Sequence, residues 1–131
     1  MIKSNRRWNN KYGAKKTEYN GRKYDSKFEA GIAAQLDLRM RAGEFLAWEP
    51  QYKVEMWAYN KHGEKAIKKT HKVDFRIHED DGTFTLLEAK GFETSDYLDR
   101  KRWLLKLWLP ENPDHRYEVV KQRGYNNRGT K

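Results

Sequence analysis

The sequence predicts a single α/β domain in which one helix is followed by three strands, a second helix and a last strand. Apolar residues recur at helical spacing in residues 26–41 and 94–109, and they alternate with polar residues in the stretches between and after them. With 131 residues the chain can bury a modest core but has no room for two domains of ordinary size. We therefore expect one domain at residues 25–121, preceded by a basic arm with a short hairpin at 1–24 and followed by a basic tail at 122–131.

The composition excludes several classes of protein. Cysteine is absent, so disulfides, cysteine-based zinc sites and cysteine nucleophiles are ruled out. No apolar run approaches the roughly 18 residues that span a bilayer, and no apolar signal segment follows the basic start. Aromatic residues make up 14% of the chain, which argues against a fully disordered protein. We expect a soluble, intracellular protein without a membrane partner.

The net charge of +9 is concentrated at the two ends of the chain. Residues 1–24 carry eight Lys and Arg against one acid, and residues 121–131 carry four against none, whereas residues 25–120 carry sixteen against eighteen. Basic ends around a slightly acidic body fit an anionic polymer as partner, because the ends can neutralise phosphates. Charged tails that only keep the protein soluble are an equally good explanation of the ends alone.

The N-terminal part of the chain predicts a hairpin followed by a helix. Asn20-Gly21 suits a two-residue turn with both residues at positive φ, in a hairpin over residues 17–24. The helix opens at Asp25 and Ser26, runs to about Arg41 and ends before a glycine. Its apolar face is formed by Ile32, Ala33, Leu36 and Met40.

Glu29 falls in the middle of that apolar face. Ser26 and Glu29 also have the spacing of a capping box, in which the glutamate reaches back to the cap amide. A capping glutamate usually lies at the solvent-facing edge of a helix, whereas a carboxylate centred on an apolar stripe is costly unless something pairs with it. We therefore favour a functional role for Glu29 over a capping role.

Three strands of an antiparallel meander are expected at residues 51–59, 66–78 and 84–90. The first strand alternates apolar and polar residues along its length. Turns that contain Gly63 and Gly82 join the three strands. The meander therefore places the second strand beside the third.

The second and third strands carry the residues that could bind a metal ion or take part in catalysis. Asp74 alternates with Val73 and Phe75, which puts it on the side opposite an apolar row. Glu88 and Lys90 are two residues apart on a strand and so share a face. If the strands are neighbours, two carboxylates and one amine meet at a single spot. Such a pocket suits a hard divalent cation and a phosphodiester.

The second helix is capped by Thr94 or Ser95 and ends at Leu109-Pro110. After a turn, a last strand is expected at residues 117–121. The predicted apolar face of the helix contains Tyr97, Leu98, Leu104, Leu105, Trp108 and Leu109.

Lys101 lies near the centre of this second apolar face. A lysine stem can pack at the edge of a core while its ammonium stays in water, which is the structural explanation. Because each helix puts one ionisable side chain in its buried stripe, a functional role is the alternative. Trp103 and Leu107 lie off the face and are candidates for covering a partner chain.

The order of elements, with Val73-Asp74 and Glu88-Ala89-Lys90 on two of the strands, resembles the core of the PD-(D/E)XK nuclease superfamily. Val73 stands where the usual proline would be. Three segments look more narrowly like the small phage endonucleases that act on branched DNA, among them Holliday-junction resolvases; these segments are Tyr24–Ala30, Val73–Phe75 and Glu88–Gly91. The resemblance covers roughly residues 17–121 and implies a restriction-endonuclease-like nuclease domain, with the order α-β-β-β-α-β and a central mixed sheet flanked by helices.

The resemblance also implies roles for individual residues. The implied ligands of Mg²⁺ or Mn²⁺ are Asp74, Glu88, the Ala89 carbonyl and, directly or through water, Glu29. Lys90 would hold or help deprotonate the attacking water and neutralise charge in the transition state. Lys101 would touch the scissile phosphate. The implied reaction is hydrolysis of a DNA phosphodiester that leaves 5′-phosphate and 3′-hydroxyl ends.

Basic residues outside this cluster are candidates for contacts with DNA phosphates. They are Arg6, Arg7, Lys15, Lys16, Arg22, Lys23, Lys72, Arg100 and Arg102. No groove-entering element with base-contacting side chains is evident beyond the core, so we expect selectivity for branched DNA structure and not for sequence. Resolving a four-way junction takes two paired cuts, so the resemblance implies a homodimer, in the host cytoplasm if a phage encodes it.

Two other functions fit the same residues. One is a less selective nicking or flap-type phage nuclease, which would cut linear or forked DNA as readily as a junction. The other is a non-catalytic nucleic-acid-binding module whose acids are only surface charge. That module would gain no stability from Mg²⁺ or Mn²⁺.

The histidines do not indicate a zinc site, because the spacing of the four is not that of metal ligands. His71, three residues before Asp74, is a candidate for a base that supports the metal site. A lone histidine on a strand is more often on the surface, and we interpret His71 as a surface residue.

Overall fold

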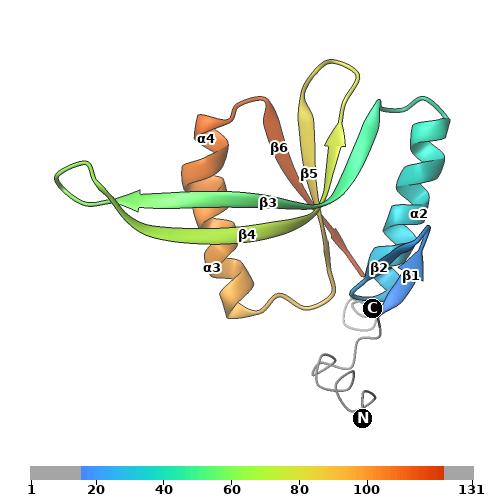
Figure 1. The fold of residues 1–131 in the computed structure, drawn as a ribbon, viewed down its shortest axis with the longest axis horizontal. Helices are drawn as coiled ribbons and strands as arrows, with labels where there is room; N and C mark the ends of the chain where they lie inside the picture. The colour runs from blue at the N-terminus through green and yellow to red at the C-terminus, as the bar shows by residue number, and fades with distance from the viewer. Residues whose placement is uncertain (1–15, 123–131) are drawn as a thin grey trace, which may run out of the picture. The chain divides into compact units, whose positions relative to one another are not determined.

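The computed structural model describes residues 16–122, which divide into two compact units between Ala42 and Gly43. Figure 1 labels the strands and α-helices of both units. In the first unit these are β1 (Thr17–Tyr19), β2 (Arg22–Tyr24) and α2 (Lys27–Arg41). In the second they are β3 (Ala47–Tyr59), β4 (Lys65–His78), β5 (Phe84–Lys90), α3 (Ser95–Trp103), η1 (Leu104–Trp108), α4 (Leu109–Glu111) and β6 (His115–Lys121). The predicted α/β class and the predicted order of elements are confirmed.

The first unit is a two-stranded hairpin followed by a helix. Asn20 and Gly21 have φ angles of 53° and 81°, so the predicted turn with two positive φ angles is confirmed. The Tyr19 hydroxyl donates a hydrogen bond of 2.7 Å to Asp37 on α2, which ties the hairpin to the helix. Ser26 caps α2 by accepting a hydrogen bond of 3.1 Å from the backbone N–H of Glu29.

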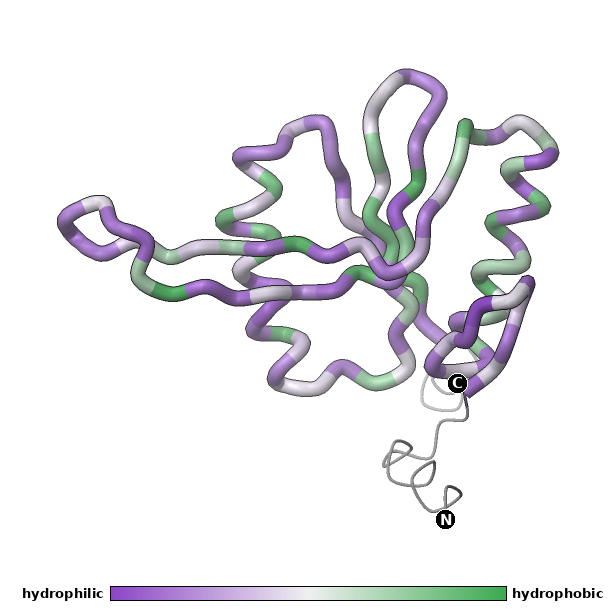
Figure 2. The backbone as a smooth tube through the Cα atoms, viewed as in Figure 1, coloured by the Kyte–Doolittle hydropathy of each residue, from purple (hydrophilic) through white to green (hydrophobic). Residues whose placement is uncertain are grey.

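The second unit is built on a mixed sheet with the strand order β3-β4-β5-β6. The pairs β3–β4 and β4–β5 are antiparallel, and β5–β6 is parallel, so the predicted meander and mixed sheet are confirmed. The strand β3 begins four residues earlier than predicted, at Ala47, and β6 begins two residues earlier, at His115. Figure 2 shows hydrophobic residues in the middle of β5, where the strands of the sheet come together.

The helical segment that follows β5 is not a regular α-helix throughout. It begins at the Thr94 cap and continues through a π-helical turn, η1, in which the N–H of Leu109 donates to the carbonyl of Leu104. Pro110 explains this turn, because proline has no N–H to give to the carbonyl four residues before it and its ring crowds that carbonyl. The inserted turn also rotates the residues near it relative to an ideal helical wheel.

The predicted apolar face of this helix is therefore correct only in part. Tyr97 and Leu104 are buried, but Leu98 and Leu105 are exposed. Trp103, a candidate for covering a partner chain, is partly buried and packs against the core cluster of Val54, Met56, Val73, Leu86 and Leu104. The π turn and the long β3–β4 hairpin, which gives Trp103 a surface to pack on, explain the difference. Among residues 16–122 no helix is both long enough and apolar enough to cross a membrane.

Candidate active site

Asp74 and the segment Glu88–Lys90 meet at the point where the β4–β5 ladder ends. The last paired residues of the ladder are Phe75 and Leu87, so Asp74 and Glu88 come next on their strands. The Asp74 carboxylate accepts a hydrogen bond of 2.8 Å from the backbone N–H of Ala89. The structure thus brings together the residues that the sequence placed on neighbouring strands.

The side chains of β4 stop alternating regularly between the two faces of the sheet at Asp74. Val73 and Phe75 therefore do not share one face, as the predicted apolar row required. Val73 belongs to the same core cluster as Leu86, and Leu86 lies directly opposite Arg76 in the ladder. Residues 73 and 76 therefore face the same side, whereas a regular strand would turn them to opposite sides. Phe75 faces away from that cluster and packs its ring edge-on against Trp48.

Gln51 lies on β3, opposite Asp74 of β4. Its φ angle is 58°, in the left-handed region that non-glycine residues seldom adopt. Irregularities of this kind occur often beside active sites, because they re-aim one side chain out of a regular strand. Here the change of face has a definite result: His71 and Glu88 come to lie on the same side of the sheet.

Glu88 is the centre of a buried hydrogen-bonded group that we call the Glu88 cluster, formed by His71, Glu88, Tyr97, Arg100 and Tyr117. The side chain of Glu88 is 2% exposed, and its oxygen Oε1 accepts hydrogen bonds from His71 Nε2–H at 2.8 Å and from the Tyr117 hydroxyl at 2.9 Å. The Tyr97 hydroxyl donates to Tyr117 at 2.7 Å. A buried carboxylate needs such donors, because desolvation without them is costly.

His71 is not the surface histidine that the sequence suggested, since it is only 3% exposed. The Arg100 Nε–H donates to His71 Nδ1 at 3.1 Å, so Nδ1 accepts and the ring proton lies on Nε2, facing Glu88. Arg100 is paired in turn with Asp96, one helical turn earlier. His71 therefore links the helix α3 to Glu88. No feature of the sequence indicated this pairing, because it depends on the change of face at Asp74.

Two lysines lie near the ring of Tyr97. The sequence predicted Tyr97 only as part of the apolar face of its helix. Lys90 Nζ is 4.0 Å and Lys101 Nζ is 5.9 Å from the centre of the Tyr97 ring. Burial raises the pKa of Tyr97 to about 12, an effect to which the negative charges of Glu88 and Asp74 contribute. Burial, together with the charge of Glu88, also raises the pKa of Tyr117. Both phenols are therefore neutral at physiological pH and act as hydrogen-bond donors.

The oxygen atoms that the resemblance assigns to a divalent cation lie at the end of the ladder. The hydrogen bonds described above involve Oδ2 of Asp74 and Oε1 of Glu88. The N–H and the carbonyl of a strand residue point to the same side, so the Ala89 carbonyl points toward Asp74 as its N–H does. Within residues 16–122 no group of three or more His, Asp or Glu side chains is arranged to hold a metal. Mg²⁺ is commonly held by one or two carboxylates, with phosphate oxygens and water completing its shell.

Glu29 lies in the first unit, on α2, and is 5% exposed. Its burial agrees with its predicted place on the apolar face and differs from the exposed position of a usual capping glutamate. Its role as a metal ligand remains a prediction.

The predicted DNA contacts have different surroundings in the structure. Lys16 pairs with Asp25 at 3.1 Å. Arg100 is held by His71 and Asp96, and is therefore part of the Glu88 cluster instead of a free phosphate contact. The exposed residues are Lys16, Arg22, Lys23, Lys72 and Arg102, whereas Arg6, Arg7 and Lys15 lie outside the described residues.

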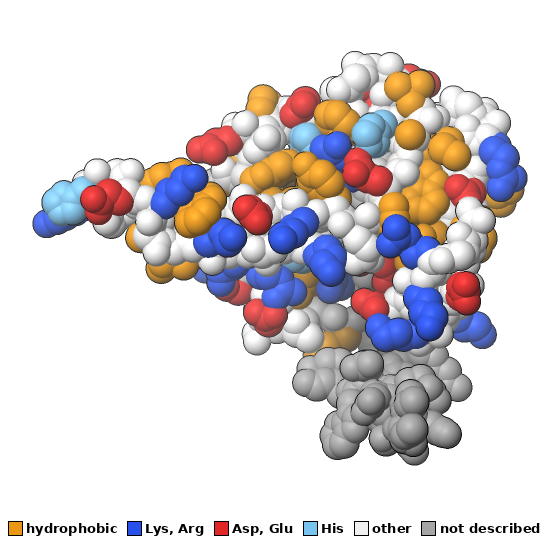
Figure 3. All heavy atoms as spheres, in the orientation of Figure 1, with side chains coloured by type: hydrophobic (Ala, Val, Ile, Leu, Met, Phe, Trp, Pro, Cys, Tyr) orange, Lys and Arg blue, Asp and Glu red, His pale blue; other side chains and the backbone are white. Residues whose placement is uncertain are grey.

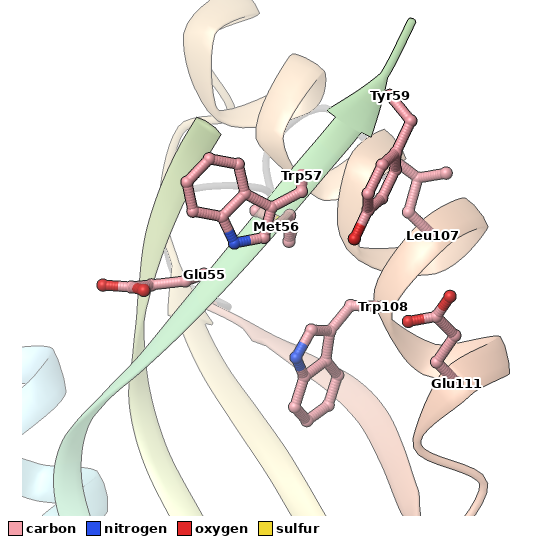
Figure 4. A pocket seen from close by; sticks show the side chains of 7 residues that line it. All are labelled: Glu55, Met56, Trp57, Tyr59, Leu107, Trp108 and Glu111. Atoms are coloured by element: carbon pink, nitrogen blue, oxygen red, sulfur yellow. The ribbon is translucent and has the colours of Figure 1, made fainter. Parts of the chain in front are cut away.

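A separate pocket lies between β3 and the helical segment of η1 and α4 (Figure 4). Its volume is about 130 Å³, and aromatic rings and two glutamates line it. The lining residues are Glu55, Met56, Trp57, Tyr59, Leu107, Trp108 and Glu111. Leu107, predicted to face a partner chain, is 40% exposed at this pocket. None of the predicted catalytic or metal-binding residues contributes to it.

Comparisons with known proteins complete the description of the chain. No curated protein and no solved structure matches it. The model of one protein family matches residues 9–123, which is most of the chain. The chain therefore belongs to this family, which is described as a protein of unknown function, DUF1064.

Proposed function

We propose that this protein is a metal-dependent endodeoxyribonuclease that hydrolyses phosphodiesters in branched DNA. One observation carries the proposal: Asp74 and the segment Glu88-Ala89-Lys90 lie on adjacent strands, at the open end of their ladder, with a hydrogen bond of 2.8 Å between the Asp74 carboxylate and the Ala89 N–H. The order of helices and strands and the mixed sheet also support it. The PD-(D/E)XK fold and the nuclease activity are parts of this one proposal.

Each residue of the site has a proposed task. Asp74, Glu88 and the Ala89 carbonyl hold Mg²⁺ or Mn²⁺, which when bound polarises the phosphate and neutralises its charge. Lys90 orients the attacking water and stabilises the charge that develops in the transition state. Its ammonium lies 4.0 Å from the centre of the Tyr97 ring, which favours a cation at this position.

The Glu88 cluster has a positioning task in this proposal. His71 and Tyr117 both donate to Oε1, which fixes the carboxylate and directs its second oxygen. Arg100 fixes the ring of His71 in turn. Glu29 and Lys101 keep the roles that the resemblance implies, as an additional metal ligand and as a contact to the scissile phosphate.

The preference for branched DNA and the homodimer rest on the resemblance to small phage endonucleases. Two paired cuts across a junction need two active sites, which a homodimer supplies. A less selective nicking or flap-type enzyme would share the site but not the selectivity. Cleavage of four-way, Y-shaped and linear DNA of matching sequence, compared side by side, separates these two versions.

The test is cleavage of a labelled four-way junction in Mg²⁺ or in EDTA, with wild type, Asp74→Asn and Lys90→Ala. Asp80→Asn is the matched control, because Asp80 is an exposed acid in the turn between β4 and β5. We expect paired symmetric cuts by wild type and Asp80→Asn in Mg²⁺, and none in EDTA or with either site variant. Equal cleavage by Asp74→Asn and wild type would refute the proposed site.

A second candidate function, a non-catalytic nucleic-acid-binding module, is favoured by one observation. Glu88 Oε1 is already satisfied by two donors, as expected of a carboxylate that serves only the fold. Under this alternative the protein binds the junction without cutting it in Mg²⁺ or Mn²⁺. Divalent cations then leave the melting temperature unchanged.

A further inference from the structure

The strands β3 and β4 extend well beyond the rest of the sheet. The strand β5 pairs only with residues 75–78 of β4, so residues 52–59 of β3 and 65–73 of β4 form a two-stranded ribbon of their own, the β3–β4 ribbon. One face of the ribbon carries Val54, Met56 and Val73 and packs in the core cluster. The opposite face, which we call the outer face, carries Lys53, Glu55, Trp57, Lys65, Lys68, Thr70 and Lys72.

The charges of the outer face do little to stabilise the ribbon. Lys53 and Lys72 lie directly opposite each other, where like charges are unfavourable. The outer face has one acid, Glu55, whose carboxylate is 3.9 Å from Lys53 and 3.7 Å from Lys68, at side chains that are about half exposed. Pairs of this kind contribute little. The outer face thus has a surplus of positive charge that the fold does not require.

An aromatic ring lies among these lysines. Trp57 is half-buried, and Lys65 Nζ and Lys68 Nζ lie 4.6 Å and 5.7 Å from the centre of its ring. Figure 3 shows basic side chains spaced along the ribbon, where all of them are lysines. A partly exposed aromatic ring with cations beside it can serve as a platform for an unpaired nucleotide, because the base stacks on the ring while its phosphates contact the cations.

We propose that the outer face of the β3–β4 ribbon binds single-stranded nucleic acid, with phosphates on Lys53, Lys68 and Lys72 and a base stacked on Trp57. From Lys72 to Lys65 the strand rises about 23 Å, at about 3.3 Å per residue. This length corresponds to about seven nucleotides at the spacing of about 3.4 Å that one strand has in a DNA duplex, and to fewer in a more extended strand. The proposal goes beyond the proposed function and does not depend on cleavage, since none of these residues belongs to the candidate active site.

The electrostatic part is tested by fluorescence anisotropy of a labelled oligothymidylate of about seven nucleotides or longer, in EDTA, at a series of salt concentrations. Wild type is compared with the triple variant Lys53→Gln, Lys68→Gln, Lys72→Gln. The matched control removes three exposed charges elsewhere, with Lys27→Gln, Arg41→Gln and Lys106→Gln. For the ribbon variant we expect the slope of log K against log salt to fall by about 2, at about 0.7 for each lysine, and for the control no change. Equal losses in the two variants would overturn the proposal.

The stacking part is tested with Trp57→Ala and Trp57→Phe, each checked by circular dichroism. We expect Trp57→Ala to weaken binding about 5- to 140-fold, since one stacked base contributes about 1–3 kcal/mol and 1.4 kcal/mol is tenfold. Trp57→Phe should restore most of the affinity, because a phenyl ring still offers a face for stacking. Unchanged binding by a folded Trp57→Ala variant, or tighter binding of a duplex than of the single strand, would refute the stacking role. Combining the variants with Asp74→Asn separates this result from cleavage: single-strand binding must survive that substitution.

Discussion

Charged side chains are used in opposite ways at the Glu88 cluster and on the outer face of the β3–β4 ribbon. In the cluster, one buried carboxylate has two donors on the same oxygen, and each donor is itself held by another residue. On the outer face, Lys53 and Lys72 lie opposite each other, and one half-exposed glutamate, Glu55, lies near Lys53 and Lys68. Buried charge must be satisfied within the fold, whereas exposed charge can remain available to a ligand. The first arrangement fixes geometry and the second is suited to binding.

The largest effect we expect separates the two regions directly. Replacing Glu88 by alanine leaves the N–H of His71 and the hydroxyl of Tyr117 without their acceptor, and should lower the free energy of unfolding by about 2–4 kcal/mol. Replacing Glu55 by alanine on the outer face should change it by less than about 0.5 kcal/mol. Urea unfolding in EDTA measures both. Similar losses in the two variants would show that burial does not distinguish these carboxylates.

The pH dependence of stability is the second test of the cluster. Burial raises the pKa of Tyr97 from its ordinary value of 10.0 to about 12, so folding favours the neutral phenol. The corresponding stability, about 2–3 kcal/mol, is fully present below pH 10 and is lost as the pH rises from 10 toward 12. Tyr97→Phe should unfold with a weaker dependence on pH in this range. If wild type and variant lose stability in parallel, the buried phenol is not the group that titrates.

The smallest effect concerns the outer face. Lys72→Gln removes one of two opposed lysines and should raise the free energy of unfolding by about 0.2–1 kcal/mol at low salt, because like charges opposite each other are unfavourable. The gain should fade at high salt, where these exposed charges are screened. Lys106→Gln, on the helical segment, is the control. A loss of stability in Lys72→Gln would mean that this lysine serves the fold.

Much of the fold could be predicted from the sequence because local signals were strong. Asn20-Gly21 fixed the hairpin turn, the caps at Ser26 and Thr94 fixed two helix starts, and alternation located the strands. The bounds of β5 agree with the prediction, since its turn and its motif lie at its two ends. These features depend on residues close together in the chain.

The parts that were missed depend on contacts between distant segments. His71 is buried because β4 changes face at Asp74, opposite a residue of positive φ, and a strictly alternating pattern gives no sign of that change. Trp103 packs inward because a π turn follows it and a long ribbon lies beside it. Arg100 donates a hydrogen bond to His71, which is 29 residues away in the sequence. Sequence reading found the carboxylates and the lysine of the site, but not the residues that hold them.

The most direct test of the central claim is whether Asp74 and Glu88 together bind a divalent cation. Isothermal titration of Mn²⁺ into the protein, with wild type, Asp74→Asn and the control Asp80→Asn, measures this without any DNA. We expect binding to wild type and the control, a rise in their melting temperature with Mn²⁺, and loss of both effects in Asp74→Asn. Without metal, Asp74→Asn should be at least as stable as wild type, since it removes one of two neighbouring negative charges. Equal Mn²⁺ binding by Asp74→Asn and wild type would contradict the account.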